Sequence, residues 1–310
     1  MLLIHAAGNE TESAEFARGI IERVSRDFPV IAVNLSEVDE LSKASPTLKD
    51  SLPPNAVMVC ETNTNRLDLD PDLFLLIRKK GTDVFKPSGL ETAPFADAIV
   101  ESENGRLSPG FEDFSFAFNH WTFKREATAI IMAGGDSQRM GRDKSLLEID
   151  GEPMISRIAR QLKPSFKNLL ISAAKATAFD SLGIDVVPDE APGAGPLMAL
   201  VSALSKSETD LNFVMPCDIP DPPQHLIARL LRESRDADIV VPMTEAGELE
   251  PLFAVYRKSV LPSAREALNR GARRVISFYE KHKVKRLALD RESVLLNLNT
   301  MDDYLARVKR

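Results

Sequence analysis

The second half of the chain is organised around residues 129–144, which read AIIMAGGDSQRMGRDK. The apolar run 129–133 predicts a buried strand, and Gly134 and Gly135 follow it directly. Two successive glycines let a backbone curl closely around a ligand with its N–H groups pointing inward. The polar and basic residues of the loop are Ser137, Arg139, Arg142 and Lys144. A strand followed by a glycine-rich loop and cations predicts a polyphosphate site, although the spacing is neither Walker A nor G-x-G-x-x-G.

Strand-like apolar runs alternate with helical patterns along the whole chain, which predicts an α/β fold. We expect a smaller α/β domain over residues 1–125 and a larger Rossmann-like domain over residues 126–310, with a mostly parallel sheet and helices on both faces. The expected strands are 2–6, 30–34, 57–60, 73–77, 98–100, 127–133, 169–172, 185–187, 211–215, 239–242 and 252–256. The expected helices are 13–26, 153–162, 196–205, 223–234, 259–270, 272–282 and 301–309.

Composition excludes several classes of protein. Of the 310 residues, 44% are hydrophobic and 27% are charged, which is typical of globular chains. No apolar run is long enough to cross a membrane. The two cysteines, Cys60 and Cys217, cannot form a disulfide framework, so we expect a protein of the reducing cytoplasm.

The charge distribution argues against nucleic-acid binding. Residues 1–125 contain 13 Lys and Arg against 20 Asp and Glu, and the remaining residues are balanced. An acidic chain with a pI near 5.3 lacks the basic domain of a nucleic-acid binder. The aromatic-rich stretch 107–124 is poor in basic residues, so we interpret it as buried packing rather than as a base-stacking surface.

Residues 133–144 resemble the signature loop of the MobA-type nucleotidyltransferases, and most closely that of the molybdenum cofactor guanylyltransferases. That family transfers GMP from GTP to the terminal phosphate of molybdopterin and releases pyrophosphate. Cytidylyltransferases of the superfamily usually carry Ala-Ala-Gly where this chain has Ala-Gly-Gly, which favours guanine. Other segments that resemble the family follow in its order: 186–189, 193–197, 215–220, 250–256, 271–275 and 297–300.

The resemblance and the chemistry of phosphoryl transfer imply roles for the charged residues. Asp218 follows the strand 211–215 at its carboxyl end, and we interpret it as the Mg²⁺ ligand, with a helix cap before Pro222 as the alternative. Lys144 is expected to contact the phosphates and offset charge on the leaving pyrophosphate. Arg139 would do the same or brace the loop. The residues expected to line the nucleotide through the strand end and the loop are Met132, Ala133, Gly134, Gly135 and Ser137.

The base and the acceptor have their own candidates. Asp189 could accept hydrogen bonds from guanine N1–H and N2–H₂, or it could be a turn residue after Pro188. Ser172 ends a strand at a position where the family often has Asn. Asn297 and Asn299 would lie near the acceptor, or belong to a turn before a helix capped by Thr300. Arg273 and Arg274 could receive the pterin phosphate or face solvent.

The first domain resembles a nucleotide-binding fold, and the whole chain allows alternative functions. Residues 1–125 open with a strand and a short Gly turn, but Glu10 and Glu12 stand where a P-loop needs Lys. We interpret this part as a degenerate P-loop-like domain that binds molybdopterin, a carrier protein or a target molybdoenzyme. The alternatives for the whole chain are a CTP donor, a sugar-phosphate acceptor, or a non-catalytic adaptor or chaperone. We expect neither a nucleic acid nor a membrane as partner.

Overall fold

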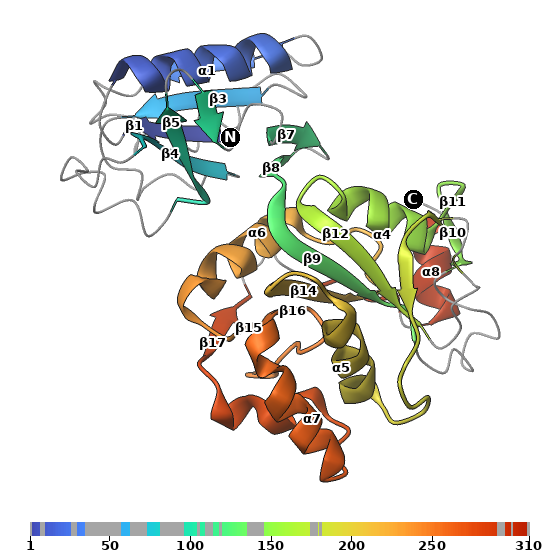
Figure 1. Cartoon of the computed structure of the whole chain (residues 1–310). Helices are drawn as coiled ribbons and strands as arrows, with labels where there is room; N and C mark the ends of the chain where they lie inside the picture. Colours follow the sequence, from blue (N-terminus) through green and yellow to red (C-terminus); the bar gives the residue numbers. More distant parts are fainter. Residues whose placement is uncertain are drawn as a thin grey trace. The chain divides into compact units, whose positions relative to one another are not determined.

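The computed structural model describes residues 2–6, 10–25, 30–34, 57–62, 73–80, 96–103, 106–108, 114–117, 120–134, 146–173, 179, 182–289, 295–298 and 300–308. The chain divides into two compact units, Met1–Phe123 and Lys124–Arg310 (Figure 1). Each unit is an α/β structure built around its own sheet, so the α/β fold expected from the sequence is confirmed. In the described part of the chain, no helix is both long and apolar enough to cross a membrane.

The first unit contains a six-stranded sheet in the order β2-β3-β1-β4-β5-β6. All neighbouring strands are parallel except β6, which pairs antiparallel with β5. The elements are β1 (Leu2–Ala6), α1 (Glu10–Val24), β2 (Val30–Asn34), β3 (Val57–Thr62), β4 (Leu73–Lys79), β5 (Ala98–Glu103) and β6 (Arg106–Ser108). The five strands expected in this unit are therefore present.

The aromatic stretch supplies part of the core of the first unit. It forms a two-stranded antiparallel sheet of β7 (Phe114–Ala117) and β8 (His120–Phe123). Phe114 and Trp121 are buried in one hydrophobic cluster with Phe16 of α1 and with residues of β4 and β5. The rings of Phe114 and Phe16 meet edge to face at 5.7 Å. The buried-packing interpretation is confirmed for these side chains.

The second unit contains a seven-stranded sheet in the order β13-β12-β9-β14-β16-β15-β17. Only β16 runs antiparallel to its neighbours, so the sheet is mostly parallel. The strands are β9 (Arg125–Met132), β12 (Phe166–Ser172), β13 (Asp185–Val187), β14 (Leu211–Pro216), β15 (Ile239–Met243), β16 (Ala254–Arg257) and β17 (Val284–Ala288). Burial on both faces accounts for the continuous apolar runs of the central strands β9, β14, β15 and β16.

Two hydrophobic clusters cover the two faces of this sheet. One face is covered by α4 (Met154–Leu162) and α6 (Gln224–Glu233), and Leu298 and Tyr304 also pack there. The other is covered by α5 (Pro196–Lys206), α7 (Leu261–Asn269) and the 3₁₀ segment η8 (Val275–Lys281). The last helix, α8 (Met301–Val308), closes the described chain. Helices on both faces agree with the Rossmann-like expectation.

The α-helix expected over 272–282 is wrong, because this segment forms 3₁₀ turns from Val275 to Lys281. Val275 and Phe278 are both buried, and a spacing of three residues puts two side chains on one side of a 3₁₀ helix. The β-branched and aromatic residues of this run also have low α-helix propensity.

Two strand regions of the second unit were absent from the sequence prediction. The strand β17 pairs with β15, but Lys285 and Arg286 interrupt its apolar pattern. The strands β10 (Glu148–Ile149) and β11 (Glu152–Pro153) form a short hairpin. Asp150 and Gly151 connect them, both with positive φ, and Asp-Gly is a strong signal for a two-residue hairpin turn.

Candidate active site

The predicted ligand residues of the second unit follow strands that end at one edge of the sheet. Ser172 is in register with both Val187 of β13 and Met132 of β9, and Met132 is in register with Pro216 of β14. Asp189 and Asp218 lie two residues beyond the ends of β13 and β14. Ligands of open α/β sheets bind outside the carboxyl ends of the strands, so this edge is the candidate active site.

Backbone hydrogen bonds fix the start of the glycine loop to its neighbours. The Ala133 N–H donates to the Ser172 carbonyl at 2.8 Å, and the Cys217 N–H donates to the Met132 carbonyl at 3.1 Å. Gly134 is exposed, and no atom lies within 4 Å of the position that a Cβ would take. Among the described residues, the space beside Gly134 is therefore open. The candidates Gly135, Ser137, Arg139 and Lys144 lie outside the described residues.

Asp218 lies in a half-buried turn after β14 and does not cap a helix. Helix α6 begins only at Gln224, its N-cap is Pro223, and that helix end has no side-chain cap. The Asp218 carbonyl accepts a hydrogen bond from the Leu298 N–H at 2.8 Å. This bond brings the segment around exposed Asn297 to the turn of Asp218, whereas Asn299 lies outside the described residues.

A second carboxylate near Asp218 was absent from the predicted site. Burial raises the pKa of Glu250, and the negative charges of Glu248 and Asp218 raise it further. The sequence signal was present, because Glu250 opens the segment 250–256 that resembles the family. Among the residues that the structure describes, no group of three or more His, Cys, Asp or Glu side chains is arranged to hold a metal ion. Asp218 and Glu250 are thus two carboxylates, which is fewer ligands than a site formed by the protein alone would need.

A hydroxyl and a carboxylate oxygen at the same edge are among the buried polar groups that have no hydrogen-bond partner in the described part of the chain. They are the Ser172 hydroxyl and the Oδ1 atom of Asp189. Burial raises the pKa of Asp189. A buried polar atom that lacks a partner is costly, and a ligand that donates hydrogen bonds would remove that cost.

The turn before α5 brings another predicted segment close to the edge. Gly195 has φ +93°, and a Cβ at this position would lie 3.2 Å from the Arg273 Cβ. The Leu197 N–H donates to the Arg273 carbonyl at 3.2 Å. Segments 193–197 and 271–275 are therefore in contact. The side chains of Arg273 and Arg274 are exposed. Neither forms an ion pair with another of the described residues.

Comparison with known proteins finds matches in the second unit. The model of the MobA-like NTP transferase domain matches residues 129–285, which lie entirely in the second unit and include Ser172, Asp189 and Asp218. The chain belongs to the MobA-like NTP transferase family. It is accordingly a nucleotidyltransferase, and the resemblance seen in the sequence is confirmed.

Relatives of this MobA-like transferase are similar to its second unit. A probable molybdenum cofactor guanylyltransferase from Pelotomaculum thermopropionicum is 37% identical over 191 residues, which cover 59% of this chain and 93% of the relative. A molybdenum cofactor guanylyltransferase from Shewanella baltica is 34% identical over 177 residues, covering 56% and 90%.

A solved structure from Archaeoglobus fulgidus has the same fold as the MobA-like unit. It is the molybdopterin-guanine dinucleotide biosynthesis protein A of that organism, and it is 20% identical with a TM-score of 0.50. The match covers 59% of this chain and 97% of the other. At this identity the likeness supports the fold alone.

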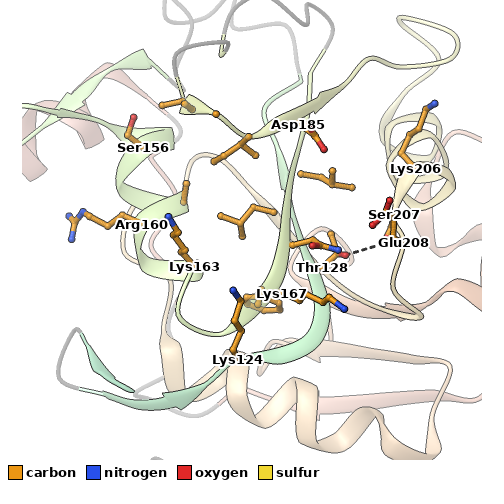
Figure 2. Close-up of a pocket in the computed structure, with 18 residues that line it drawn as sticks. Lys124, Thr128, Ser156, Arg160, Lys163, Lys167, Asp185, Lys206, Ser207 and Glu208 are labelled. Carbon is orange, nitrogen blue, oxygen red and sulfur yellow. Dashed lines mark hydrogen bonds between the residues drawn. The ribbon is translucent and has the colours of Figure 1, made fainter. Parts of the chain in front are cut away.

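A hollow of about 570 Å³ lies elsewhere on the MobA-like unit, around the amino-terminal parts of β9, β12 and β13 (Figure 2). Five basic side chains line it, and two of them are already in ion pairs, Arg160 with Glu152 and Lys167 with Glu126. None of the predicted site residues is among the residues that line it. The hollow is therefore not the candidate active site, which lies beyond the opposite ends of the same strands.

Proposed function

We propose that this nucleotidyltransferase transfers GMP from GTP to the terminal phosphate of molybdopterin, with Mg²⁺ as the metal and pyrophosphate as the second product. The observation that supports this most strongly is the convergence of Gly134, Ser172, Asp189 and Asp218 at one edge of the sheet. The names of the relatives, which are guanylyltransferases of the molybdenum cofactor, support the same donor and acceptor.

Asp218 and Glu250 fit a magnesium ion. Mg²⁺ usually binds one or two protein carboxylates and completes its octahedral shell with water and substrate phosphates. Two carboxylates close enough for one to raise the pKa of the other are a pair that a cation would stabilise. When bound, the ion would neutralise charge on the triphosphate and the attacking phosphate. Asp218 would be its ligand, and Glu250 would bind it directly or through water.

The glycine loop would hold the triphosphate. The backbone of Met132 and Ala133 is fixed at the sheet edge by the bonds to Cys217 and Ser172. From there the loop would turn around the phosphates, with Lys144 neutralising the leaving pyrophosphate and Arg139 assisting it or bracing the loop. The further loop groups in contact with the phosphates would be Gly134, Gly135 and Ser137.

Asp189 would select guanine. An ionised carboxylate accepts the N1–H and N2–H₂ donors of guanine together, whereas cytosine has no such pair. Burial disfavours the ionised form of Asp189, and the two donors of the base would restore it. The Ser172 hydroxyl, buried beside the same strand ends, would gain a partner from the nucleotide.

The acceptor would approach from the side of Asn297 and Asn299, with Arg273 near its phosphate. An oxygen of the molybdopterin phosphate attacks the α-phosphorus of GTP, a new P–O bond forms, and the bond to the pyrophosphate oxygen breaks. Both reactants are anionic, so the residues act mainly by neutralising charge and by aligning the attacking and leaving oxygens.

Turnover of the full-length protein with matched variants tests the proposal. Asp218→Asn should lower turnover with GTP, Mg²⁺ and molybdopterin by about 10²–10³, the usual effect of losing one electrostatic contact to a transition state. Asp236→Asn changes an exposed aspartate paired with Lys283 and should leave turnover within about twofold of wild type. Undiminished turnover of Asp218→Asn, or a preference for CTP, would contradict the proposal.

We also propose that the first domain, residues 1–125, binds a partner without hydrolysing nucleotide. The acidic residues after β1, Glu10 and Glu12, support this because a P-loop requires a lysine to hold phosphates. The Asp218→Asn variant impairs the proposed transfer site. Hydrolysis of GTP to GDP that is measured in this variant would therefore be attributable to the first domain. Such hydrolysis would contradict the proposal.

A further inference from the structure

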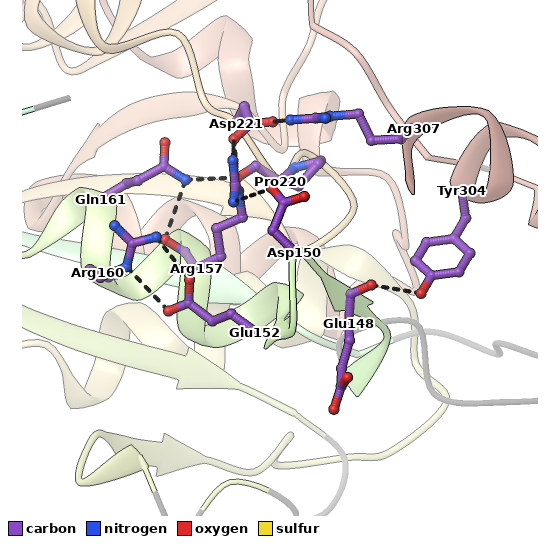
Figure 3. A network of polar contacts seen from close by, with 10 residues as sticks. All are labelled: Glu148, Asp150, Glu152, Arg157, Arg160, Gln161, Pro220, Asp221, Tyr304 and Arg307. Carbon is purple, nitrogen blue, oxygen red and sulfur yellow. Dashed lines mark hydrogen bonds and ion pairs between the residues drawn. The ribbon is translucent and has the colours of Figure 1, made fainter. Parts of the chain in front are cut away.

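The carboxylate of Asp221, three residues after Asp218, is held by two arginines from distant parts of the chain (Figure 3). Arg157 of α4 donates through Nε to Oδ1 at 2.8 Å, and its Nη2 lies 2.7 Å from the same oxygen. Arg307 of α8 donates through Nη2 to Oδ2 at 2.6 Å. Each carboxylate oxygen is thus fixed by a different element. We call Asp221, Arg157 and Arg307 the Asp221 clamp.

Helix α4 holds this turn at two successive residues. Gln161, one helical turn after Arg157, is buried and donates to the Pro220 carbonyl at 2.8 Å. Arg157 is itself held by Asp150 of the hairpin turn at 3.1 Å, and only 18% of its side chain is exposed. The helix surface therefore presents two rigid donors to the turn, and both are used.

The C-terminal segment is joined to the same turn at both of its ends. Leu298 donates to the Asp218 carbonyl, and Arg307 binds Asp221. Between them, Thr300 and Asp303 make reciprocal side-chain-to-backbone bonds of 3.1 and 2.8 Å that start α8. A movement of α8 would thus be transmitted to the turn that carries Asp218.

We propose that Asp221 and Arg307 are positioning residues that set the place of the Asp218 carboxylate and tie the Asn297 segment to it. The role of Asp218 itself rests on the proposed function. Residues 218–222 lie between β14 and α6 and belong to neither a helix nor a strand, so their conformation depends on bonds from other elements. A displacement of about 1 Å in a supporting contact can lower a reaction rate about a hundredfold, which gives the clamp its significance for catalysis.

A set of three variants tests the Asp221 clamp. Arg307→Ala removes one arm, and Arg307→Lys keeps the charge but loses the planar fork. Arg160→Ala is the matched control, because Arg160 lies on α4 and makes a two-bond pair with Glu152 at 2.8 and 3.2 Å. The measurements on the full chain are amide hydrogen exchange at Leu298 and Cys217, Mn²⁺ affinity in the presence of GTP, and kcat with KM for GTP.

Arg307→Ala should speed exchange at Leu298 about tenfold, weaken Mn²⁺ binding about tenfold and lower kcat by about ten- to a hundredfold, with KM for GTP changed less than threefold. Arg307→Lys should recover part of each loss, and Arg160→Ala should match wild type. Wild-type exchange and Mn²⁺ affinity in Arg307→Ala, or equal changes in Arg160→Ala, would overturn the proposal. If the wild-type protein fails to transfer GMP, the proposed function is overturned. Amide exchange at Leu298 needs no substrate, so it still tests the Asp221 clamp in that case.

Discussion

Replacing Gly195 by alanine should destabilise the second unit strongly. Gly195 has φ +93° and ψ 179°, a backbone region that is essentially restricted to glycine and costs other residues about 1–3 kcal/mol. The new Cβ would also lie 3.2 Å from the Arg273 Cβ and 3.5 Å from the Arg273 carbonyl oxygen. Neither neighbour is the free end of a flexible side chain, so the backbone must move. We expect a loss of about 2–4 kcal/mol in the free energy of unfolding.

Gly247→Ala is the matched control for this effect. Gly247 also has a positive φ, +82°, but nothing lies within 4 Å of its Cβ position. Only the left-handed backbone penalty remains, about 1–2 kcal/mol. Urea unfolding followed by circular dichroism reports both units, whereas fluorescence of Trp121, the single tryptophan, reports the first. A change in the unfolding midpoint that appears in the dichroism signal and not in the fluorescence signal therefore belongs to the second unit.

The outcome also bears on the site, because Gly195 and Arg273 join two segments of the candidate active site. Gly195→Ala should lower the midpoint of the second unit more than Gly247→Ala does, and the fluorescence transition should stay unchanged in both. Equal losses in the two variants would refute the argument that contact with Arg273 requires glycine at residue 195.

Three further predictions concern buried and half-buried polar groups. Tyr256→Phe leaves the Pro251 carbonyl and the Tyr279 hydroxyl, 2.5 and 2.6 Å from the lost oxygen, without that partner, and urea unfolding should show a loss of about 1–3 kcal/mol. Burial raises the pKa of Asp221, but hydrogen bonds from Arg307 and Arg157 outweigh this and bring the pKa below its ordinary value. The stability that Asp221 contributes is therefore present above the unfolded pKa and lost as pH falls through the folded value, so Asp221→Asn should flatten the acid limb of a stability–pH curve below about pH 4. Asp189→Asn should raise KM for GTP at least about tenfold, and an unchanged KM in steady-state assays would remove its assigned role.

The sequence predicted the central strands of the second unit well because β9, β14, β15 and β16 are buried on both faces. Their apolar runs are continuous, and turn residues such as Gly134 and Pro188 mark their ends. The placement of Ser172, Asp189 and Asp218 at one edge followed from parallel pairing, which brings carboxyl ends together. The helix expected over 272–282 was wrong because the spacing of three between buried Val275 and Phe278 fits an α-helix and a 3₁₀ helix alike.

The contacts that sequence reasoning missed all depend on pairing between distant segments. Glu250 comes near Asp218 because β16 runs antiparallel to β14, which places the start of β16 beside the end of β14. The apolar sequence of a strand does not specify its direction, so this contact could not be predicted. Asp221 meets Arg157 and Arg307, which lie 64 and 86 residues away in sequence. From the sequence, each of these three residues taken singly is expected to be a solvated charge on the surface. The clamp becomes visible only after α4 and α8 have been placed on the same face.

Isotope transfer from GTP tests the central claim most directly. The full-length protein would be incubated with Mg²⁺, molybdopterin and GTP labelled either at the α- or at the γ-phosphate. We predict that the α-label appears in a molybdopterin–guanine dinucleotide and the γ-label in pyrophosphate, in equal amounts. An α-label that stays in GTP, or a dinucleotide that forms as readily from CTP, would contradict the account.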